Sequence, residues 1–322
     1  MKFYALICIL TAISLILTPA IVLLRPNEAQ PTAAQTAPEE EKTVTVFLSA
    51  NESTVTMPLE EYVVGAVAAE MPASSHPQAL MAQAVACRTF ALYRQRMEKA
   101  APTSSLRGAD LSDQPQRHQG YLSEDARREK WGEDFKENEA KVRDAVRQTN
   151  NEIMTYNGEP IFAAFFAVSS GQTESAETVF GDDLPYLKSV VCDEDLLSPD
   201  CTRAVVYTAE EFRASAQTID GVTLPDDEED WISETDASDS GFVRQITLGE
   251  TQVTGMRFRD AFSLRSAVFT VSRTESGFRI TTKGFGHLVG MSQYAADTMA
   301  RSGADHKQIL RRFYTDVKIT DE

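Results

Sequence analysis

Positive charge is scarce in this 322-residue chain. It carries 31 lysine and arginine residues against 48 aspartate and glutamate residues, which gives a net charge of −17. Proteins that bind nucleic acid need a basic surface, so this balance excludes nucleic acid as a partner. It also opposes docking of the folded part of the chain on an anionic lipid surface.

Signatures of metal sites and of serine nucleophiles are missing as well. The four cysteines contain no CxxC pair, and no cluster of histidine and cysteine has strong zinc-site spacing. The GxSxG pattern of a strand-turn-helix nucleophile is absent. Cys87 lies in an apolar segment and is expected to pack there. Cys192 and Cys201 close a short loop, and outside the cytoplasm we predict a disulfide between them, with two free thiols as the alternative.

A single long hydrophobic run stands at the start of the chain. Residues 3–24 carry no charge and are bounded by Lys2 and Arg25, a length that spans a bilayer. We therefore predict a short stub and transmembrane helix over 1–25, although a cleaved signal peptide is the competing interpretation. Residues 26–42 are rich in Pro, Ala, Gln, Thr and Glu and are predicted to form a linker. Residues 43–322 then form the folded domain.

The rest of the chain mixes helical and strand patterns without a βαβ order. With 42% hydrophobic residues, it can bury a large core. We predict an α+β fold in a single large domain, or in two closely joined lobes, with mostly antiparallel strands. The expected elements are a strand hairpin (42–48 and 53–57), two apolar helices (58–92), one helical stripe (124–149), strands around Asn157-Gly158 (153–156 and 160–168), a solvated acidic excursion (226–239), a hairpin (268–273 and 278–282) and two last helices (291–302 and 306–314).

The apolar helical pair contains two isolated charges. Glu70 continues the apolar row of Val63, Ala66 and Val67, and Arg88 lies on a similar row. Charged groups in apolar surroundings are unfavourable unless they are paired or belong to a site. A carboxyl group there tends to have a raised pKa, which suits a general acid. The alternative is a Glu70–Arg88 ion pair that only ties the two helices together.

Three blocks of sequence resemble the stage II sporulation protein D family, whose domain is shared with amidase-enhancer proteins. The first is Leu59-Glu60-Glu61-Tyr62-Val63 with Ala69-Glu70-Met71-Pro72 and the stretch from Ala79 to Thr89; the second runs from Tyr156-Asn157-Gly158 through Phe165–Thr173 to Pro185–Val190; the third is Gly284–Tyr294. They stand in family order and cover about residues 44–320.

The resemblance implies a peptidoglycan lytic transglycosylase with Glu70 as its single catalytic acid/base. Such an enzyme cuts glycan strands to 1,6-anhydro-N-acetylmuramic acid ends without consuming water. The resemblance also implies substrate-binding positions in a glycan-binding groove, namely Arg88, Tyr186, Lys188, Ser169, Ser170, Thr173, His287, Ser292 and Gln293. Tyr186 and Lys188 would face the same side of an extended stretch, although a solvated lysine on an exposed strand has the same spacing.

The chain departs from the family in the segment Asp110–Tyr121, where some members hold zinc. Ser112 stands where a cysteine is expected, and His118 is the one good ligand that remains. We therefore predict no metal and no cofactor. This also opposes a zinc amidase as a further reading of the chain.

The partners that the resemblance implies are peptidoglycan glycan strands, a cell-wall amidase that strips stem peptides, and a membrane protein of the engulfment machinery. It places the chain in the cell membrane, with the N-terminus in the cytoplasm and the catalytic domain between the mother-cell and forespore membranes. The alternative function is a non-catalytic peptidoglycan-binding protein that enhances an amidase.

Overall fold

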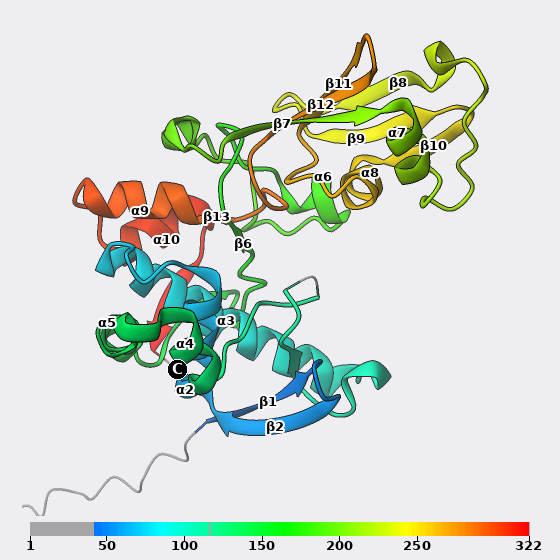
Figure 1. Cartoon of the computed structure of the whole chain (residues 1–322). Helices are drawn as coiled ribbons and strands as arrows, with labels where there is room; N and C mark the ends of the chain where they lie inside the picture. The colour runs from blue at the N-terminus through cyan, green and yellow to red at the C-terminus, as the bar shows by residue number, and fades with distance from the viewer. Residues whose placement is uncertain (1–41, 116, 322) are drawn as a thin grey trace, which may run out of the picture. The chain divides into compact units, whose positions relative to one another are not determined.

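A computed structural model describes residues 42–115 and 117–321 of the chain (Figure 1). The predicted anchor at 1–25 and nearly all of the predicted linker at 26–42 lie outside the described residues. Within the described part, no helix is long and apolar enough to cross a bilayer.

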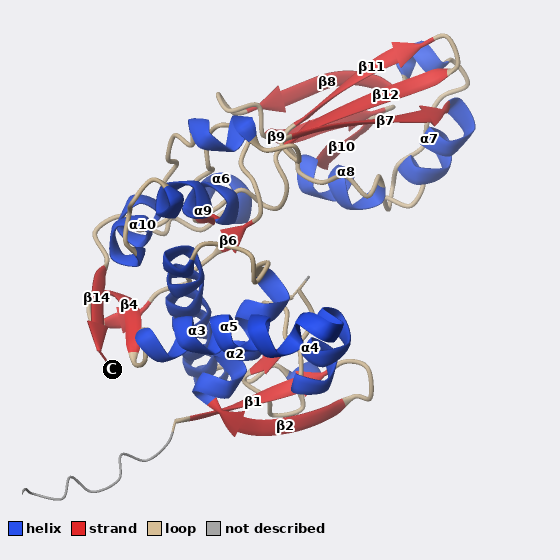
Figure 2. Ribbon diagram, turned by 60° about the vertical axis from the view of Figure 1, so that its left-hand side comes forward, coloured by secondary structure: helices blue, strands red, loops and turns tan. Residues whose placement is uncertain are grey.

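The described residues form an α+β fold, as predicted (Figure 2). The helices are α2 (Leu59–Glu70), α3 (Pro77–Ala100), α4 (Glu124–Trp131), α5 (Phe135–Gln148), α6 (Ala176–Phe180), α7 (Ala209–Ala216), α8 (Gly255–Ala261), α9 (Gln293–Arg301) and α10 (His306–Phe313). The strands are β1 (Thr43–Leu48), β2 (Ser53–Pro58), β3 (Leu111–Ser112), β4 (Glu152–Tyr156), β5 (Glu159–Pro160), β6 (Phe165–Phe166), β7 (Thr202–Thr208), β8 (Ile232–Ala237), β9 (Val243–Leu248), β10 (Thr251–Thr254), β11 (Phe269–Thr274), β12 (Gly277–Lys283), β13 (Met291–Ser292) and β14 (Lys318–Asp321).

The strands form small sheets that are mostly antiparallel. Their orders are β2-β1-β3, β10-β9-β8, β11-β12-β7, β13-β6 and β14-β4-β5, and the parallel pairs are β1–β3 and β6–β13. The first predicted hairpin is confirmed, since β1 and β2 pair from Thr43 opposite Pro58 to Leu48 opposite Ser53. The second is confirmed as β11 and β12.

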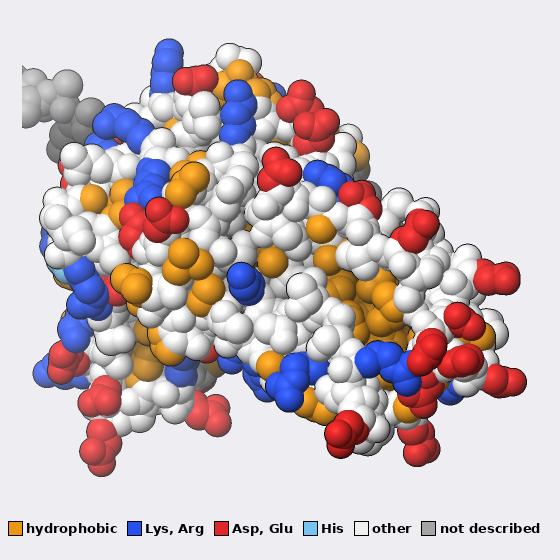
Figure 3. All heavy atoms as spheres, turned by 90° about the horizontal axis from the view of Figure 1, so that it is seen from above, with side chains coloured by type: hydrophobic (Ala, Val, Ile, Leu, Met, Phe, Trp, Pro, Cys, Tyr) orange, Lys and Arg blue, Asp and Glu red, His pale blue; other side chains and the backbone are white. Residues whose placement is uncertain are grey.

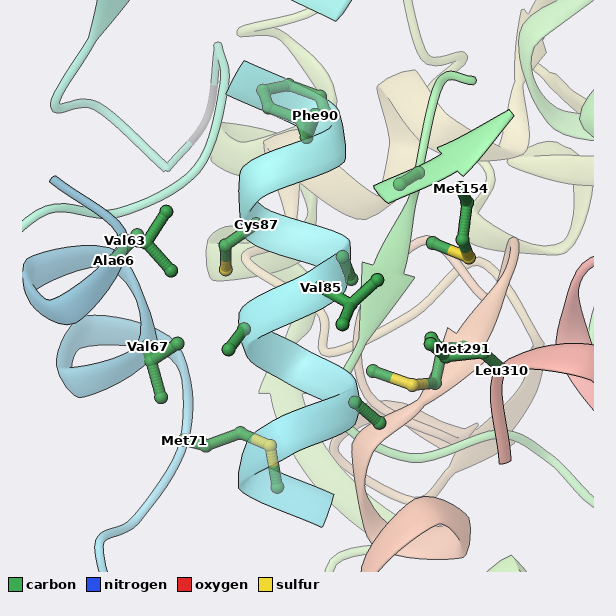
Figure 4. Close-up of a cluster of buried hydrophobic side chains, with 14 of the residues drawn as sticks. Val63, Ala66, Val67, Met71, Val85, Cys87, Phe90, Met154, Met291 and Leu310 are labelled. Atoms are coloured by element: carbon green, nitrogen blue, oxygen red, sulfur yellow. The ribbon is translucent and has the colours of Figure 1, made fainter. Parts of the chain in front are cut away.

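Helix α3 is the centre of the main core. Its start is fixed by Pro77 in the first turn and by His76, whose ring accepts a hydrogen bond from the Gln78 amide. Figure 4 shows Cys87 of α3 pointing toward α2, while Val85 points the other way, toward Met154 and Met291. Because α3 is packed on both sides, its middle carries apolar residues almost all round, which confirms that Cys87 serves packing.

The predicted helical stripe over 124–149 is broken into two helices. Gly132 adopts φ +52° and ψ −122°, a conformation outside the helical region that glycine reaches without steric cost. A short 3-10 turn follows, and α5 then begins at Phe135. The Asn157-Gly158 turn is confirmed between β4 and β5, with φ +52° and +83°. The strand expected over 160–168 is reduced to short pieces at β5 and β6.

Residues 202–283 form a separate lobe, here called the inserted lobe; residues 43–201 and 284–321 form the helical lobe. The inserted lobe has its own aromatic core, in which Phe212, Trp231 and Phe278 pack ring to ring. The prediction of a solvated excursion at 226–239 is therefore wrong in part. Its acidic side chains are mostly exposed, but Trp231 is 1% exposed and residues 232–237 form β8.

The predicted disulfide is not formed. Cys192 and Cys201 are both buried free thiols. The Cys201 thiol donates to the carbonyl oxygen of Ser169, with 3.7 Å between sulfur and oxygen. Burial raises the pKa of the Cys192 thiol to about 12. A protonated thiol in an apolar setting behaves as a small packing residue, so these two cysteines resemble Cys87 more than a cross-link.

Candidate active site

Glu70 is the last residue of α2. The helix ends there because Met71 precedes Pro72, and a residue before proline is driven into extended conformation. Met71 indeed adopts φ −122° and ψ 145°. The seven residues from Tyr62 to Ala68 are buried, whereas Glu70 is half-buried. Helix α2 thus places the Glu70 carboxyl group at the edge of the apolar core.

The carboxyl group of Glu70 is held by the backbone of a distant segment. The Gly120 amide donates a hydrogen bond to Oε1 of Glu70 at 2.5 Å. The Gly120–Leu122 segment also lies along α2, since the Leu122 amide donates to the Gly65 carbonyl and the Tyr121 ring stacks on Tyr62 at 5.5 Å. The position of the acid is therefore set by main-chain packing and not by a side-chain partner.

The electrostatics of Glu70 match those of a general acid. Burial raises the pKa of its carboxyl group, and the Gly120 hydrogen bond and the Lys130 ammonium oppose that rise. Lys130 itself donates to the Ala68 carbonyl at the end of α2, at 2.8 Å. A carboxyl group with a raised pKa keeps its proton to higher pH, which is what proton delivery to a leaving group requires.

A buried polar network lies behind the site. The Gln119 side-chain amide donates to the Tyr62 hydroxyl at 2.9 Å and to the Cys87 carbonyl at 3.1 Å. On α3, the Gln83 amide donates to the Cys87 sulfur, and its oxygen accepts from Gln293 on α9 at 3.3 Å. This network joins the segment that holds Glu70 to α9. Gln83 and Gln119 were not foreseen from the sequence, although an amide in an apolar helix is a signal for Gln83.

A cleft of about 270 Å³ is lined by the two residues that follow Glu70 in the chain, Met71 and Pro72, but not by Glu70 itself. One wall is Met71, Pro72 and the serines that follow; the opposite walls are Ala167-Val168, Ser198–Asp200 and the exposed side of α9 from Gln293 to Arg301. Its charges are neutralised locally, because Asp297 pairs with Arg301 and Asp200 pairs with Arg265. The lining mixes apolar side chains with hydroxyl and amide groups and one aromatic ring, that of Tyr294. Such a nearly neutral surface suits a sugar chain.

Arg88 is not at the site, and the expectation that it contacts substrate or pairs with Glu70 is wrong. Its guanidinium is 1% exposed and forms two parallel hydrogen bonds with Glu60, at 2.7 and 2.6 Å. It also donates to the carbonyls of Glu152 and Val146. Successive helical residues are turned by about 100°, so Arg88 projects to the side of Cys87, which faces the middle of α2 (Figure 4). Arg88 joins α2, α5 and β4.

Tyr186 and Lys188 do not share one side of an extended stretch. Residues 185–186 form a turn, in which the Leu187 amide donates to the Leu184 carbonyl. Tyr186 is buried, and its hydroxyl accepts from the Phe162 amide at 3.2 Å. Lys188 is exposed. The expected alternation fails because the turn rotates one side chain inward and leaves the other in solvent.

Several expected substrate-binding hydroxyls are instead structural. Ser169, Thr173 and Ser292 are fully buried. The Thr173 hydroxyl accepts from the Val190 amide, and Ser292 caps the start of α9. Asp195, buried as well, accepts from the Ser169 amide at 2.7 Å and from the Ser292 hydroxyl at 2.9 Å. No pattern in the sequence indicates that this one acid among several is buried.

The remaining candidates lie around the same loops. Gln293 lines the cleft. The Ser170 hydroxyl is buried and has no hydrogen-bond partner among the described residues. His287 is half-buried between the rings of Phe166 and Phe180, and burial together with the charge of Arg259 lowers its pKa to about 4. A neutral imidazole there accepts a hydrogen bond from the Val289 amide and shapes the loop.

The segment Asp110–Tyr121 is held by hydrogen bonds of its own. Nδ1 of His118 accepts from the Ser112 amide at 2.9 Å, and a carboxylate oxygen of Asp110 accepts from the Thr45 amide. In the described part of the chain, no group of three or more His, Cys, Asp or Glu side chains could hold a metal ion. Burial lowers the pKa of His118 to about 4.

These features define an α+β protein in which one half-buried glutamate ends a helix just before two residues that line a cleft. Residues 49–156 match the family described as Stage II sporulation protein. The chain is 38% identical over 290 residues to stage II sporulation protein D of Bacillus amyloliquefaciens and 36% identical over 289 residues to that of Bacillus subtilis (strain 168). These matches cover 90% and 89% of this chain, and 82% of each relative. The chain therefore belongs to the stage II sporulation protein D family.

A more distant likeness points to a neighbouring group. The chain is 23% identical over 311 residues to a protein of Bacillus subtilis (strain 168) named amidase enhancer. That match covers 80% of this chain and 40% of the relative.

Proposed function

We propose that this sporulation-family protein is a lytic transglycosylase that cuts peptide-stripped glycan strands. The observation that carries the proposal is the isolated Glu70 carboxyl group at the end of α2, which the Gly120 amide holds in place and whose pKa is raised by burial. Burial raises the pKa of Glu70, and the Gly120 hydrogen bond and the Lys130 charge lower it; no carboxyl group is among these causes. Hydrolases that invert or retain configuration normally need two carboxyl groups.

One carboxyl group is enough for an intramolecular reaction. Glu70 first donates its proton to the glycosidic oxygen as the bond from that oxygen to C1 of N-acetylmuramic acid breaks. The resulting carboxylate then takes the proton of the C6 hydroxyl of the same sugar, and O6 bonds to C1. The products are a free hydroxyl on the leaving sugar and a 1,6-anhydro ring, Glu70 is protonated again, and no water is consumed.

The biological setting belongs to the same proposal. Residues 3–24 anchor the chain in the membrane, and residues 26–42 hold the domain away from it, between the mother-cell and forespore membranes. An amidase supplies peptide-free strands, and a membrane protein localises both during engulfment. The support is the family membership together with the charge-free run at 3–24.

The second candidate is a peptidoglycan-binding protein that enhances an amidase without cutting glycan itself. The likeness to the amidase enhancer favours it. The two functions give different products. The full chain, incubated with amidase-treated glycan strands, should release 1,6-anhydromuramyl ends that mass spectrometry identifies. Reducing N-acetylmuramic acid ends would point to a hydrolase, and intact strands would point to the enhancer.

A further inference from the structure

The sheet β11-β12-β7 of the inserted lobe has an unusual charge for this protein. Its three strands carry four basic residues, Arg203, Arg273, Arg279 and Lys283, and no acidic residue. The whole chain has a net charge of −17. Figure 3 shows acidic and basic side chains spread over one face of the molecule. A sheet that carries cations and no acidic residue is therefore a local exception.

Strand alternation puts two of the four cations on one open face. Arg279, Thr281 and Lys283 stand at every second position of β12, so their side chains point to the same side of the sheet. The residues paired with them on β11 and β7 complete this face: Ser272, Thr270, Val206, Ala204 and Thr202. All of these side chains are exposed or half-buried. We call this surface the β12 face. The opposite side of the sheet carries Phe278 and Ile280 into the core of the inserted lobe.

The cations of the β12 face are available. Within the described residues, Arg279 and Lys283 form no ion pair, unlike Arg273, which pairs with Glu228. Four residues of extended chain place the two positions about 13 Å apart. Between and beside them stand the hydroxyls of Thr281, Thr202, Thr270 and Ser272, which are donors and acceptors of the kind that sugar hydroxyls use.

The β12 face is continuous in the chain with a segment that lines the cleft. Lys283, at the end of β12, stands opposite Thr202, at the start of β7. The next residue, Gly284, donates from its amide to the Cys201 carbonyl at 2.6 Å. Ser198, Pro199 and Asp200 come just before Cys201 and line the cleft. Thr202, at the edge of the β12 face, is thus two residues along the chain from Asp200, which lines the cleft.

We propose that the β12 face binds the distal part of the glycan strand and recognises the lactyl carboxylates that peptide removal leaves behind. Hydrolysis of the amide between the lactyl group and the stem peptide frees one carboxylate on each N-acetylmuramic acid. A stripped strand is therefore a polyanion, whereas an unstripped strand carries amides and bulky peptides at these places. Arginine and lysine bind carboxylates through charge-assisted hydrogen bonds. The β12 face then selects stripped strands before cleavage.

This inference rests on the proposed function for its ligand, but its test measures binding and not cleavage. The full chain with Glu70→Gln is combined with Arg279→Gln and Lys283→Gln. The matched control combines Glu70→Gln with Arg203→Gln and Arg257→Gln. This control changes the net charge equally, at exposed positions off the β12 face. Titration of amidase-treated strands should give a Kd about three- to tenfold higher for the first variant and a change of less than about twofold for the control.

Two further arms identify the ligand chemistry. Conversion of the lactyl carboxylates to methylamides should abolish the difference between the two variants, and added salt should reduce it. Equal binding by both variants, or a loss that persists on methylamide strands, would overturn the proposal. A loss seen on phosphatidylglycerol vesicles but not on glycan would assign the face to lipid instead. Absence of anhydro products from the unmutated chain would remove the proposed reaction while leaving these binding results intact.

Discussion

The Gly120 amide reaches across 50 positions of sequence to hydrogen-bond Oε1 of Glu70 at 2.5 Å. The donor is a backbone amide, so the geometry of this hydrogen bond depends on how closely the segment around Gly120 approaches the end of α2. A Cβ atom on Gly120 would lie 3.1 Å from both Oε1 of Glu70 and the Cβ of Ala69. Glycine at 120 thus allows the contact that holds the acid in place.

The Gly120→Ala variant should be a specific catalytic defect. The added methyl must displace the carboxyl group by a few tenths of an ångström, and small displacements of a catalytic group are costly. We expect the rate of anhydro-product release to fall about tenfold or more while the melting temperature changes by only a few degrees. Unchanged turnover would show that the Gly120 contact does not position the acid.

Glu70→Gln should keep glycan binding and lose cleavage. Removal of a general acid costs about 10²–10⁴-fold in rate. The matched control is Glu129→Gln, an exposed residue on α4, which should stay within about twofold of the unmutated chain. Activity of Glu70→Gln within about threefold, roughly 0.6 kcal/mol in barrier, would remove Glu70 from the chemistry.

The same substitution should change the pH dependence of stability. The pKa of Glu70 is raised in the folded chain, so the folded state holds this proton more tightly than the unfolded state. The resulting stabilisation is complete below the unfolded pKa of about 4.3 and is lost as pH rises through the folded pKa. The melting temperature of Glu70→Gln minus that of the unmutated chain should therefore be more positive at pH 7 than at pH 4. A difference that is independent of pH would contradict the raised pKa.

Arg88→Lys should act on stability and not on turnover. Lysine cannot reproduce the paired hydrogen bonds to Glu60 or the contacts to the carbonyls of Glu152 and Val146. Because Glu60 is partly exposed, we expect a loss of about 1–3 kcal/mol in the free energy of unfolding, measured with urea. Arg128→Lys, in an exposed pair with Glu124, should cost less than about 0.5 kcal/mol. A fall in kcat of the folded Arg88→Lys variant would show that Arg88 does contribute to the active site.

Chelator should leave both activity and melting temperature unchanged. In the segment Asp110–Tyr121, His118 already accepts a backbone hydrogen bond through Nδ1, and the segment has no thiolate. One imidazole with such neighbours binds zinc too weakly to order a loop. Stoichiometric zinc in elemental analysis after metal-free purification would contradict this prediction.

Local patterns predicted the elements of the fold well. The β1–β2 hairpin follows from alternation, and α2 and α3 follow from continuous apolar rows. The Asn157-Gly158 turn follows from residues that accept positive φ. The break at Gly132 was missed because a charged helix with a regular apolar stripe gives no reason to stop other than one glycine.

The site was only partly predictable. Glu70 stood out because a single charge ended an apolar helix. The direction of the Arg88 side chain could not be predicted from the sequence. It depends on which face of α3 meets α2, and a step of one residue turns a side chain by about 100°. The burial of Asp195, and not of another acid in its loop, could not be predicted either. It depends on hydrogen bonds with Ser169 and Ser292, which are distant in the chain.

The two ends of the inserted lobe meet at one place, where the Gly284 amide bonds to the Cys201 carbonyl. Residues 202–283 thus leave the helical lobe and return to it at adjacent positions, after Cys201 and before Gly284. The two lobes also share a small core, in which Phe242 and Val268 pack with Phe166, so the inserted lobe supports the helical lobe while its sequence stays separate from the part that holds Glu70. The β12 face, which would bind the substrate, and Glu70, which would take part in its cleavage, are encoded in separate stretches of the chain. Mutations that change substrate binding can therefore arise without changes in the sequence around Glu70.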